Sequence, residues 1–240
     1  MTNVIQTSRD GAVAGITIDR AAESNLLTIE MVREMTAAFR AAARSDAKVI
    51  LLRTTGADFC RGRDNTGVPP SPTALKMRAN VCEPILDAYD AIADTPQPVV
   101  CTVQGAAHGF GCAIAGACDI SIAADNARFK LPEMEKNLPP TLAISALMPR
   151  TPRKALTWMV YSMDELDAST ALQVGIVSEV VPAAQLDGAV SKLLATMTSR
   201  SVEALVAVKD FFRSASLMEP RGVADYAGNL LASVLTSAGK

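Results

Sequence analysis

Residues 104–125 read QGAAHGFGCAIAGACDISIAAD, and this stretch decides how the fold is interpreted. The β-branched run 99–103 leads into it, and Gly105, Gly109 and Gly111 then allow a tight turn into an alanine-rich segment. The pattern predicts a strand, a turn and the start of a buried helix. Backbone N–H groups at a helix N-terminus have no partner within the helix and suit a developing anion. Close packing of strand on helix would use the same glycines, so the turn alone leaves both interpretations open.

Composition and motif spacing exclude several classes of function. Of 240 residues, 49% are hydrophobic and 20% charged, which is enough for a sizeable core in one domain with or without a small appendage. The net charge of -2 and the lack of clustered Lys and Arg argue against a nucleic-acid partner. The segment 105–111 fits neither GxGxxG nor GxxxxGK followed by Ser or Thr, so it does not predict a nucleotide site.

Cysteine usage and hydropathy predict a cytoplasmic protein with no membrane contact. No stretch reaches about 18 uninterrupted apolar residues, and residues 1–11 lack the features of a signal peptide. The cysteines are odd in number, lack CxxC spacing and are accompanied by a single histidine, which predicts reduced, mostly buried thiols and no metal site. They are Cys60, Cys82, Cys101, Cys112 and Cys118.

The order of the predicted elements is that of an α/β protein with functional loops at one end of a largely parallel sheet. Thr28 is the expected N-cap of the first helix. Strands are predicted over 4–7, 13–19, 49–53, 99–103, 120–123 and 128–131, and helices over 28–44, 73–93, 142–148, 152–161, 186–197, 202–214 and 221–235. Loops are predicted over 67–72 and 133–140. We expect a core over 1–183 and a helical C-terminal region over 184–240 that packs on the core or on another subunit.

Three blocks of sequence, in their order and spacing, resemble the enoyl-CoA hydratase/isomerase (crotonase) superfamily. Residues 56–64, GADFCRGRD, are similar to GxxF[CS]AGxD; residues 98–119 are similar to the family's glycine-rich block; and residues 127–133, ARFKLPE, are similar to AxFxxPE. The resemblance implies a crotonase-like spiral of repeated β-β-α units with a helical C-terminal region. It also implies a homotrimer or dimer of trimers that binds an acyl-CoA thioester and needs no further cofactor.

The resemblance assigns two main-chain donors to the thioester oxygen, the N–H groups of Arg63 and Phe110. An enolate oxygen is stabilised by two N–H groups about 3 Å away where water is excluded. Backbone donors tolerate side-chain changes, although both positions are usually small in the family. The resemblance places the expected coenzyme contacts in the segments 56–64 and 105–111. Because Ala22 replaces a basic residue of the family, a further contact is expected on a C-terminal helix. They are Arg61, Gly62, Asp64, Gly109, Gly111 and Lys209.

Only one of the two glutamates that many hydratases of the family use is present. Glu133 matches the second, whereas Ala113 stands at the first. Water addition by two carboxylates is therefore in doubt, while one carboxylate can move a proton between carbons. We favour double-bond isomerisation with Glu133 as the base, and Glu135 takes that role if the loop register differs.

His108 and two other functions remain as alternatives. The segment HGFG is similar to the oxyanion turn of lipases, but no GxSxG elbow exists, which excludes a serine-triad hydrolase. His108 is either a hydrogen-bonded packing residue or a direct participant that holds water in a hydratase. A non-catalytic CoA-binding scaffold would also be compatible with Ala113. Asp119 is expected to anchor neighbouring backbone.

Overall fold

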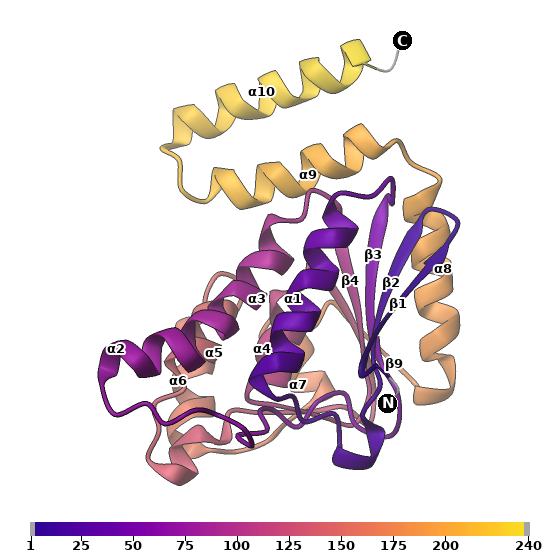
Figure 1. Ribbon diagram of the computed structural model, residues 1–240. Helices are drawn as coiled ribbons and strands as arrows, with labels where there is room; N and C mark the ends of the chain where they lie inside the picture. The colour runs from indigo at the N-terminus through magenta and orange to yellow at the C-terminus, as the bar shows by residue number, and fades with distance from the viewer. Residues whose placement is uncertain (1–2, 238–240) are drawn as a thin grey trace.

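A six-stranded sheet forms the centre of the protein, as a computed structural model of the chain shows; it describes residues 3–237 (Figure 1). The strand order is β1 (Ile5–Asp10), β2 (Val13–Ile18), β3 (Val49–Thr54), β4 (Val99–Val103), β6 (Ile120–Ala124) and β9 (Glu179–Val181). β1 pairs antiparallel with β2, and the other neighbours in this sheet are parallel. A smaller sheet has the order β5 (Ala106–His108), β7 (Arg128–Lys130) and β8 (Leu166–Asp167).

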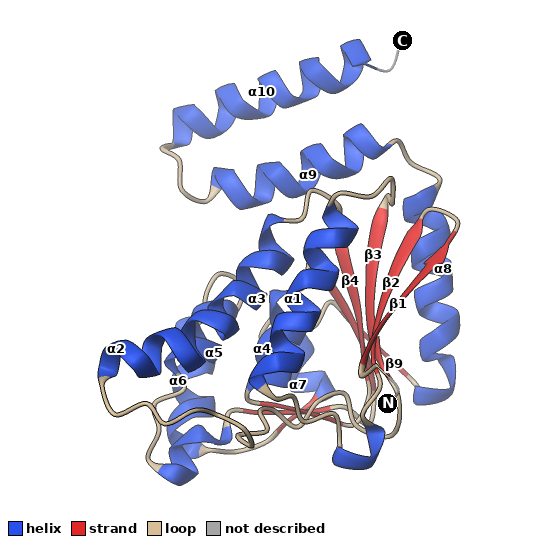
Figure 2. Ribbon diagram, viewed as in Figure 1, coloured by secondary structure: helices blue, strands red, loops and turns tan. Residues whose placement is uncertain are grey.

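The helices cover both faces and one end of the large sheet (Figure 2). Along the chain, they are η1 (Ala21–Glu23), α1 (Ile29–Ala43), α2 (Ala74–Met77), the π-helix η2 (Arg78–Cys82), α3 (Glu83–Asp94), α4 (Phe110–Ala117), η3 (Pro132–Lys136), α5 (Thr141–Leu147), α6 (Arg153–Ser162), α7 (Ala168–Gln173), η4 (Ala183–Gln185), α8 (Leu186–Thr198), α9 (Val202–Ala215) and α10 (Pro220–Ser237). None of the helices within residues 3–237 combines the length and the apolar character that crossing a bilayer requires.

Side chains that alternate along the parallel strands contribute to two hydrophobic cores, one on each face of the sheet. Ile50 and Leu52 of β3 belong to the larger core, which includes the buried faces of α1 and α3. Val49 and Leu51 point to the opposite face, where Leu186 and other buried residues of α8 cover them. β4 is buried along its whole length, as expected for a strand covered on both faces.

The C-terminal helices differ in how they contact this core. α8 packs directly against the sheet, α9 crosses the end of the sheet, and α10 lies on the outer side of α9 (Figure 1). The division of the chain at residue 183 therefore stays a prediction, since α8 shares a core with the strands.

Most predicted elements are present, and the differences concern short ones. Thr28 caps α1 as predicted, because its Oγ1 accepts a hydrogen bond from the Met31 N–H at 3.3 Å. The five cysteines are free thiols, and four of them are buried. The pattern did not predict β5, β8, β9 or α7, and it took the η3 segment for loop. These elements have two to six residues, too few to show a period of their own.

Lys209 of α9 fastens the C-terminal region to the start of β4. Its side chain is buried, and its ammonium group contacts the Ile92 carbonyl at 2.9 Å, Thr95 Oγ1 at 2.8 Å, the Gln97 carbonyl at 3.1 Å and Asp119 Oδ2 at 2.8 Å. Three ammonium hydrogens are thus shared among four protein acceptors.

The position of Lys209 does not bring it to the predicted coenzyme site. Its partners at 92–97 precede β4, whereas the glycine-rich turn follows the other end of that strand. The physical role of Lys209 is to satisfy buried carbonyls and a carboxylate. The expectation for Asp119 is confirmed, since its Oδ2 also accepts from the Val99 N–H at 2.8 Å.

We predict that Lys209→Ala lowers the free energy of unfolding by about 3 kcal/mol or more, because it leaves the Asp119 carboxylate without its buried partner. Urea unfolding followed by circular dichroism measures this loss. Lys192→Ala, on the exposed side of α8, is the control and should change stability by less than about 0.5 kcal/mol. Equal effects of the two substitutions would show that the buried contacts do not stabilise the fold.

Candidate active site

The segment 55–64, which follows β3 and is called the first loop below, is joined to β5 by main-chain hydrogen bonds. The Cys60 N–H donates to the Ala106 carbonyl at 2.9 Å, and the His108 N–H donates to the Cys60 carbonyl at 2.9 Å. These two bonds form a short parallel bridge between Cys60 and Ala107. Two segments far apart in sequence, 60–64 and 105–111, therefore lie directly beside each other.

Two glycines of the turn permit this close approach. A Cβ at Gly111 would overlap the Cys60 carbonyl oxygen, so no other residue fits there without moving the first loop. Gly109 has a φ of 51° and its Cβ would lie 2.8 Å from Glu133 Oε1. The turn thus brings three segments together: the first loop, the start of α4 and the η3 segment that carries Glu133.

The backbone on either side of Arg63 is fixed by Leu27. The Leu27 N–H donates to the Gly62 carbonyl at 3.1 Å, and the Asp64 N–H donates to the Leu27 carbonyl at 2.9 Å. In a parallel bridge of this kind, the N–H of the central residue points away from its partner. The Arg63 N–H is therefore directed to the other side of the loop and donates to no acceptor within residues 3–237.

Phe110 provides the second free amide. It is the first residue of α4, so its N–H has no acceptor within the helix. Every residue of α4 is buried, which keeps this helix end fixed against the core. Neither candidate amide is used by regular secondary structure, as the oxyanion interpretation requires.

Asp64 and Asn25 hold the first loop from outside. Asp64 accepts from the Thr66 N–H at 2.9 Å and pairs with Arg20 at 2.9 Å, and these bonds lower its pKa to about 2. Asn25 is fully buried and donates from Nδ2 to the carbonyls of Thr55 and Asp58, each at 2.8 Å. Asp64 therefore positions the loop through protein contacts, while Arg61 is exposed and pairs with Asp58 at 2.8 Å.

Glu133 presents an unpaired carboxylate to this region. Its Oε2 is buried and has no hydrogen-bond partner in the described chain, and burial raises the pKa of the carboxyl group. Tyr89 lies nearby, with its ring stacked on Phe110 at a centroid distance of 5.7 Å. Glu135 differs in both respects, since it is exposed and pairs with Lys130 at 2.6 Å. Of the two candidate bases, Glu133 is the one that faces the turn.

Arg63 carries a second unpaired charge. All three of its guanidinium nitrogens are buried, and none has a hydrogen-bond partner among residues 3–237. Burial lowers the pKa of this group, while Tyr89 and Asp64 oppose that shift. The neighbouring Asp64 carboxylate is already taken by Arg20 and Thr66.

His108 is engaged at the edge of the small sheet. Its Nε2 lies 2.9 Å from Glu165 Oε2, and Arg128 approaches the same carboxylate at 4.0 Å. Burial lowers the pKa of the imidazole, although Glu165 opposes this. This arrangement corresponds to the packing alternative, because the imidazole already has a protein partner.

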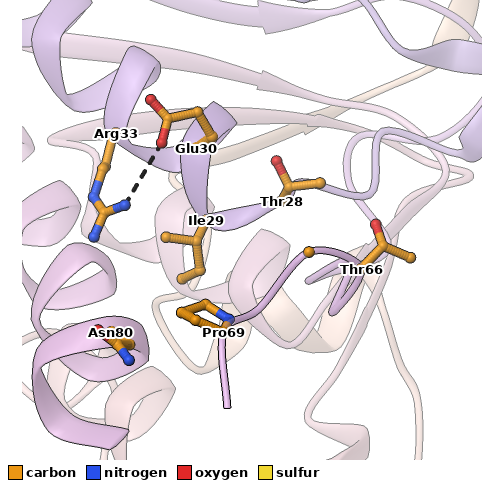
Figure 3. A pocket seen from close by; sticks show the side chains of 8 residues that line it. Thr28, Ile29, Glu30, Arg33, Thr66, Pro69 and Asn80 are labelled. Carbon is orange, nitrogen blue, oxygen red and sulfur yellow. Dashed lines mark ion pairs between the residues drawn. The ribbon is translucent and has the colours of Figure 1, made fainter. Parts of the chain in front are cut away.

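A cavity of about 430 Å³ is lined by none of the predicted site residues (Figure 3). It is bounded by the start of α1, by the segment that contains Thr66 and Pro69, and by Asn80 of η2. Glu30 and Arg33 form an ion pair of 3.5 Å at its border. Glu133 and Phe110 do not line it.

Three residues of this site were not predicted from sequence. Tyr89 lies within the helix predicted over 73–93, but its place beside Phe110 depends on how α3 packs on α4. Asn25 is buried and has a φ of 54°, a conformation that Asn tolerates better than most residues, but this residue type alone does not predict burial. Nothing in the sequence around Glu165 indicated a pairing with His108.

Comparison with known proteins identifies the family to which the chain is similar. The sequence model of the enoyl-CoA hydratase/isomerase family matches residues 8–234. A probable enoyl-CoA hydratase of Rhodobacter capsulatus is 33% identical over 172 residues, covering 71% of this chain and 65% of that protein. Human enoyl-CoA delta isomerase 2 is 28% identical over 184 residues, covering 75% of this chain and 46% of that protein.

Solved structures share the fold over nearly the whole chain. An enoyl-CoA hydratase of Mycobacterium smegmatis superposes with a TM-score of 0.91 at 24% identity, covering 97% of this chain and 91% of that one. Human enoyl Coenzyme A hydratase domain-containing protein 3 gives a TM-score of 0.91 at 23% identity, covering 97% and 92%. The predicted crotonase-like α/β fold with a helical C-terminal region is therefore confirmed.

The mouse form of the latter protein, which is named as mitochondrial, is 27% identical over 202 residues, covering 83% of this chain and 67% of that protein. The location of the present chain stays a prediction. The match over residues 8–234, together with the converging loops of the site, establishes that this chain belongs to the enoyl-CoA hydratase/isomerase family.

Proposed function

We propose that the protein converts an acyl-CoA thioester through an enolate, which the main-chain amides of Arg63 and Phe110 stabilise while Glu133 moves a proton. The most suitable reaction is migration of a carbon–carbon double bond. As the enolate forms, the thioester oxygen gains negative charge, and two fixed N–H donors lower the barrier by roughly 3 kcal/mol each. No metal or redox group is required for this step.

The observation that carries the proposal is the state of the Glu133 carboxylate. It lies against Gly109 at the turn, with Oε2 buried and unpaired. A base that removes a proton next to a carbonyl needs a raised pKa and a free oxygen. Burial raises the pKa of Glu133, and its Oε2 is free because it has no partner within the described chain.

Isomerisation is favoured over hydration because the second proton-transfer group is missing. Ala113 is fully buried in α4 and offers no carboxylate. Glu135 is held by Lys130 and His108 by Glu165, so neither is free to position a water molecule. The names of the relatives include both hydratase and isomerase, and hydration remains the alternative that the experiment must distinguish.

We also propose the homotrimer or dimer of trimers that the resemblance implies. Apolar side chains on α9 and α10 are exposed in the single chain, among them Phe212, Leu231 and Leu235. Packing against other copies would cover this surface.

Incubation with 3-enoyl-CoA and 2-enoyl-CoA in deuterated water tests the reaction type. We expect the double bond to migrate between the two positions without formation of a 3-hydroxyacyl product, as mass spectrometry of the thioesters would show. Accumulation of hydroxy product would assign hydration instead. Binding of both thioesters without any chemical change would assign a non-catalytic scaffold.

Glu133→Gln is expected to reduce kcat by roughly 100-fold or more, because the amide cannot accept the proton. Affinity for the thioester should change by less than about threefold, since the amides of Arg63 and Phe110 are retained. Glu135→Gln is the matched control on the same segment and should keep most of the activity. Comparable activity of Glu133→Gln and the wild type would reject Glu133 as the base.

The same substitution should stabilise the fold at neutral pH by about 1 kcal/mol, because it removes a buried, unpaired charge. The pKa of Glu133 is raised in the folded state, so its ionisation weakens the fold as pH rises through that pKa. The gain from Glu133→Gln should therefore disappear below about pH 4, where the carboxyl is protonated in both states. Thermal unfolding across this pH range measures the effect; a gain that did not depend on pH would contradict it.

A further inference from the structure

The side chain of Arg63 forms neither a hydrogen bond nor an ion pair within the described chain. Its three guanidinium nitrogens are buried without a hydrogen-bond partner, and no ion pair joins it to any carboxylate within residues 3–237. Arg20, also on the first loop's periphery, pairs with Asp64 at 2.9 Å, and the exposed Arg61 pairs with Asp58 at 2.8 Å. Of these three arginines, Arg63 is thus the one that forms no ion pair within the described chain.

The two unpaired charges of the site do not neutralise each other. Glu133 and Arg63 form no ion pair, although Tyr89 is close enough to both for each to influence its pKa. Both charged groups therefore lie within electrostatic range of Tyr89. Tyr89 stacks on Phe110 at a centroid distance of 5.7 Å, so its ring lies next to the second amide donor.

This location places the guanidinium on the acyl side of the thioester. The main chain of Arg63 would contact the thioester oxygen, so its side chain starts next to the reacting carbonyl and ends in a guanidinium group whose nitrogens are buried. The phosphates of coenzyme A are separated from the thioester by the pantetheine arm, and they require a more open position. Arg61, which is exposed on the same loop, is better placed for them.

The chemistry of the group indicates which ligand it takes. A guanidinium presents parallel N–H groups that match the two oxygens of a carboxylate, and such bidentate pairs are strong when buried. A buried charge without a partner is unfavourable, and an anionic ligand would remove that cost. The reach of one side chain limits the number of carbons between the thioester and this ligand group.

We propose that Arg63 binds a carboxylate at the far end of a short acyl group, so that the preferred substrate is the CoA thioester of a short dicarboxylic acid. This inference rests on the proposed function, since it assumes that the thioester oxygen lies at the Arg63 amide. Arg63 would then contact the same substrate twice, with its main-chain amide at the thioester oxygen and with its side chain at the carboxylate that determines specificity.

Calorimetric titration with glutaryl-CoA and pentanoyl-CoA tests the proposal, because the two acyl groups share five carbons and differ in a carboxylate against a methyl. The wild type should bind glutaryl-CoA about tenfold more tightly or better. Arg63→Met keeps the main-chain amide but removes the charge, so the ratio of the two affinities should fall to about one. Arg63→Lys should retain part of the preference, because a lysine offers charge without the planar pair of donors.

Arg61→Met is the matched control two residues away. Any loss of affinity that it causes should be equal for the two thioesters, so the ratio of the two affinities should stay unchanged. Equal affinity of the wild type for the two thioesters would overturn the inference while leaving the proposed function intact. A preference that survives in Arg63→Met would also overturn it. If neither thioester binds to the wild type, the proposed function itself fails.

Discussion

The pair of main-chain hydrogen bonds between Cys60 and β5 is the constraint on which the site depends. It fixes the first loop against the glycine-rich turn, and it requires that Gly111 carry no side chain. Because Leu27 pairs with the main chain on either side of Arg63, the Arg63 N–H points away from Leu27. The orientation of this candidate donor is therefore a result of backbone pairing, and that of Phe110 follows from its place at the start of α4. A side-chain change at either position leaves the amide in place.

The charges of the protein fall into two groups with opposite energetics. Arg20 with Asp64, and Lys209 with Asp119, are paired and satisfy buried or half-buried partners, so they support the loop and the C-terminal region. Glu133 Oε2 and the guanidinium of Arg63 are buried and have no hydrogen-bond partner within residues 3–237, and buried groups of this kind weaken a fold. Polar groups kept in unfavourable surroundings are typical of functional sites, where a ligand rather than the protein completes them.

The sequence predicted what local pattern determines and failed where packing decides. The apolar run of β4, the cap at Thr28 and the glycine-rich turn each depend on neighbours in the chain, and all three are as predicted. Lys209 is a predicted coenzyme contact because Ala22 replaces a basic residue of the family; its helix could be predicted, but the end of the sheet on which that helix lies could not. Likewise, no local pattern shows that the guanidinium nitrogens of Arg63 are buried, since burial depends on how distant segments pack.

This separation of backbone from side chains explains how one fold can serve different acyl-CoA reactions. In the proposed mechanism, the oxyanion donors are main-chain amides, so they persist where Ala113 stands in place of a family glutamate and Arg63 in place of a small residue. The side chains of the same site would then decide how the enolate reacts. We propose that the single carboxylate of Glu133 restricts proton transfer to carbon and that the guanidinium of Arg63 restricts the acyl group that fits. On this proposal, specificity depends on the positions at which the chain departs from the common pattern.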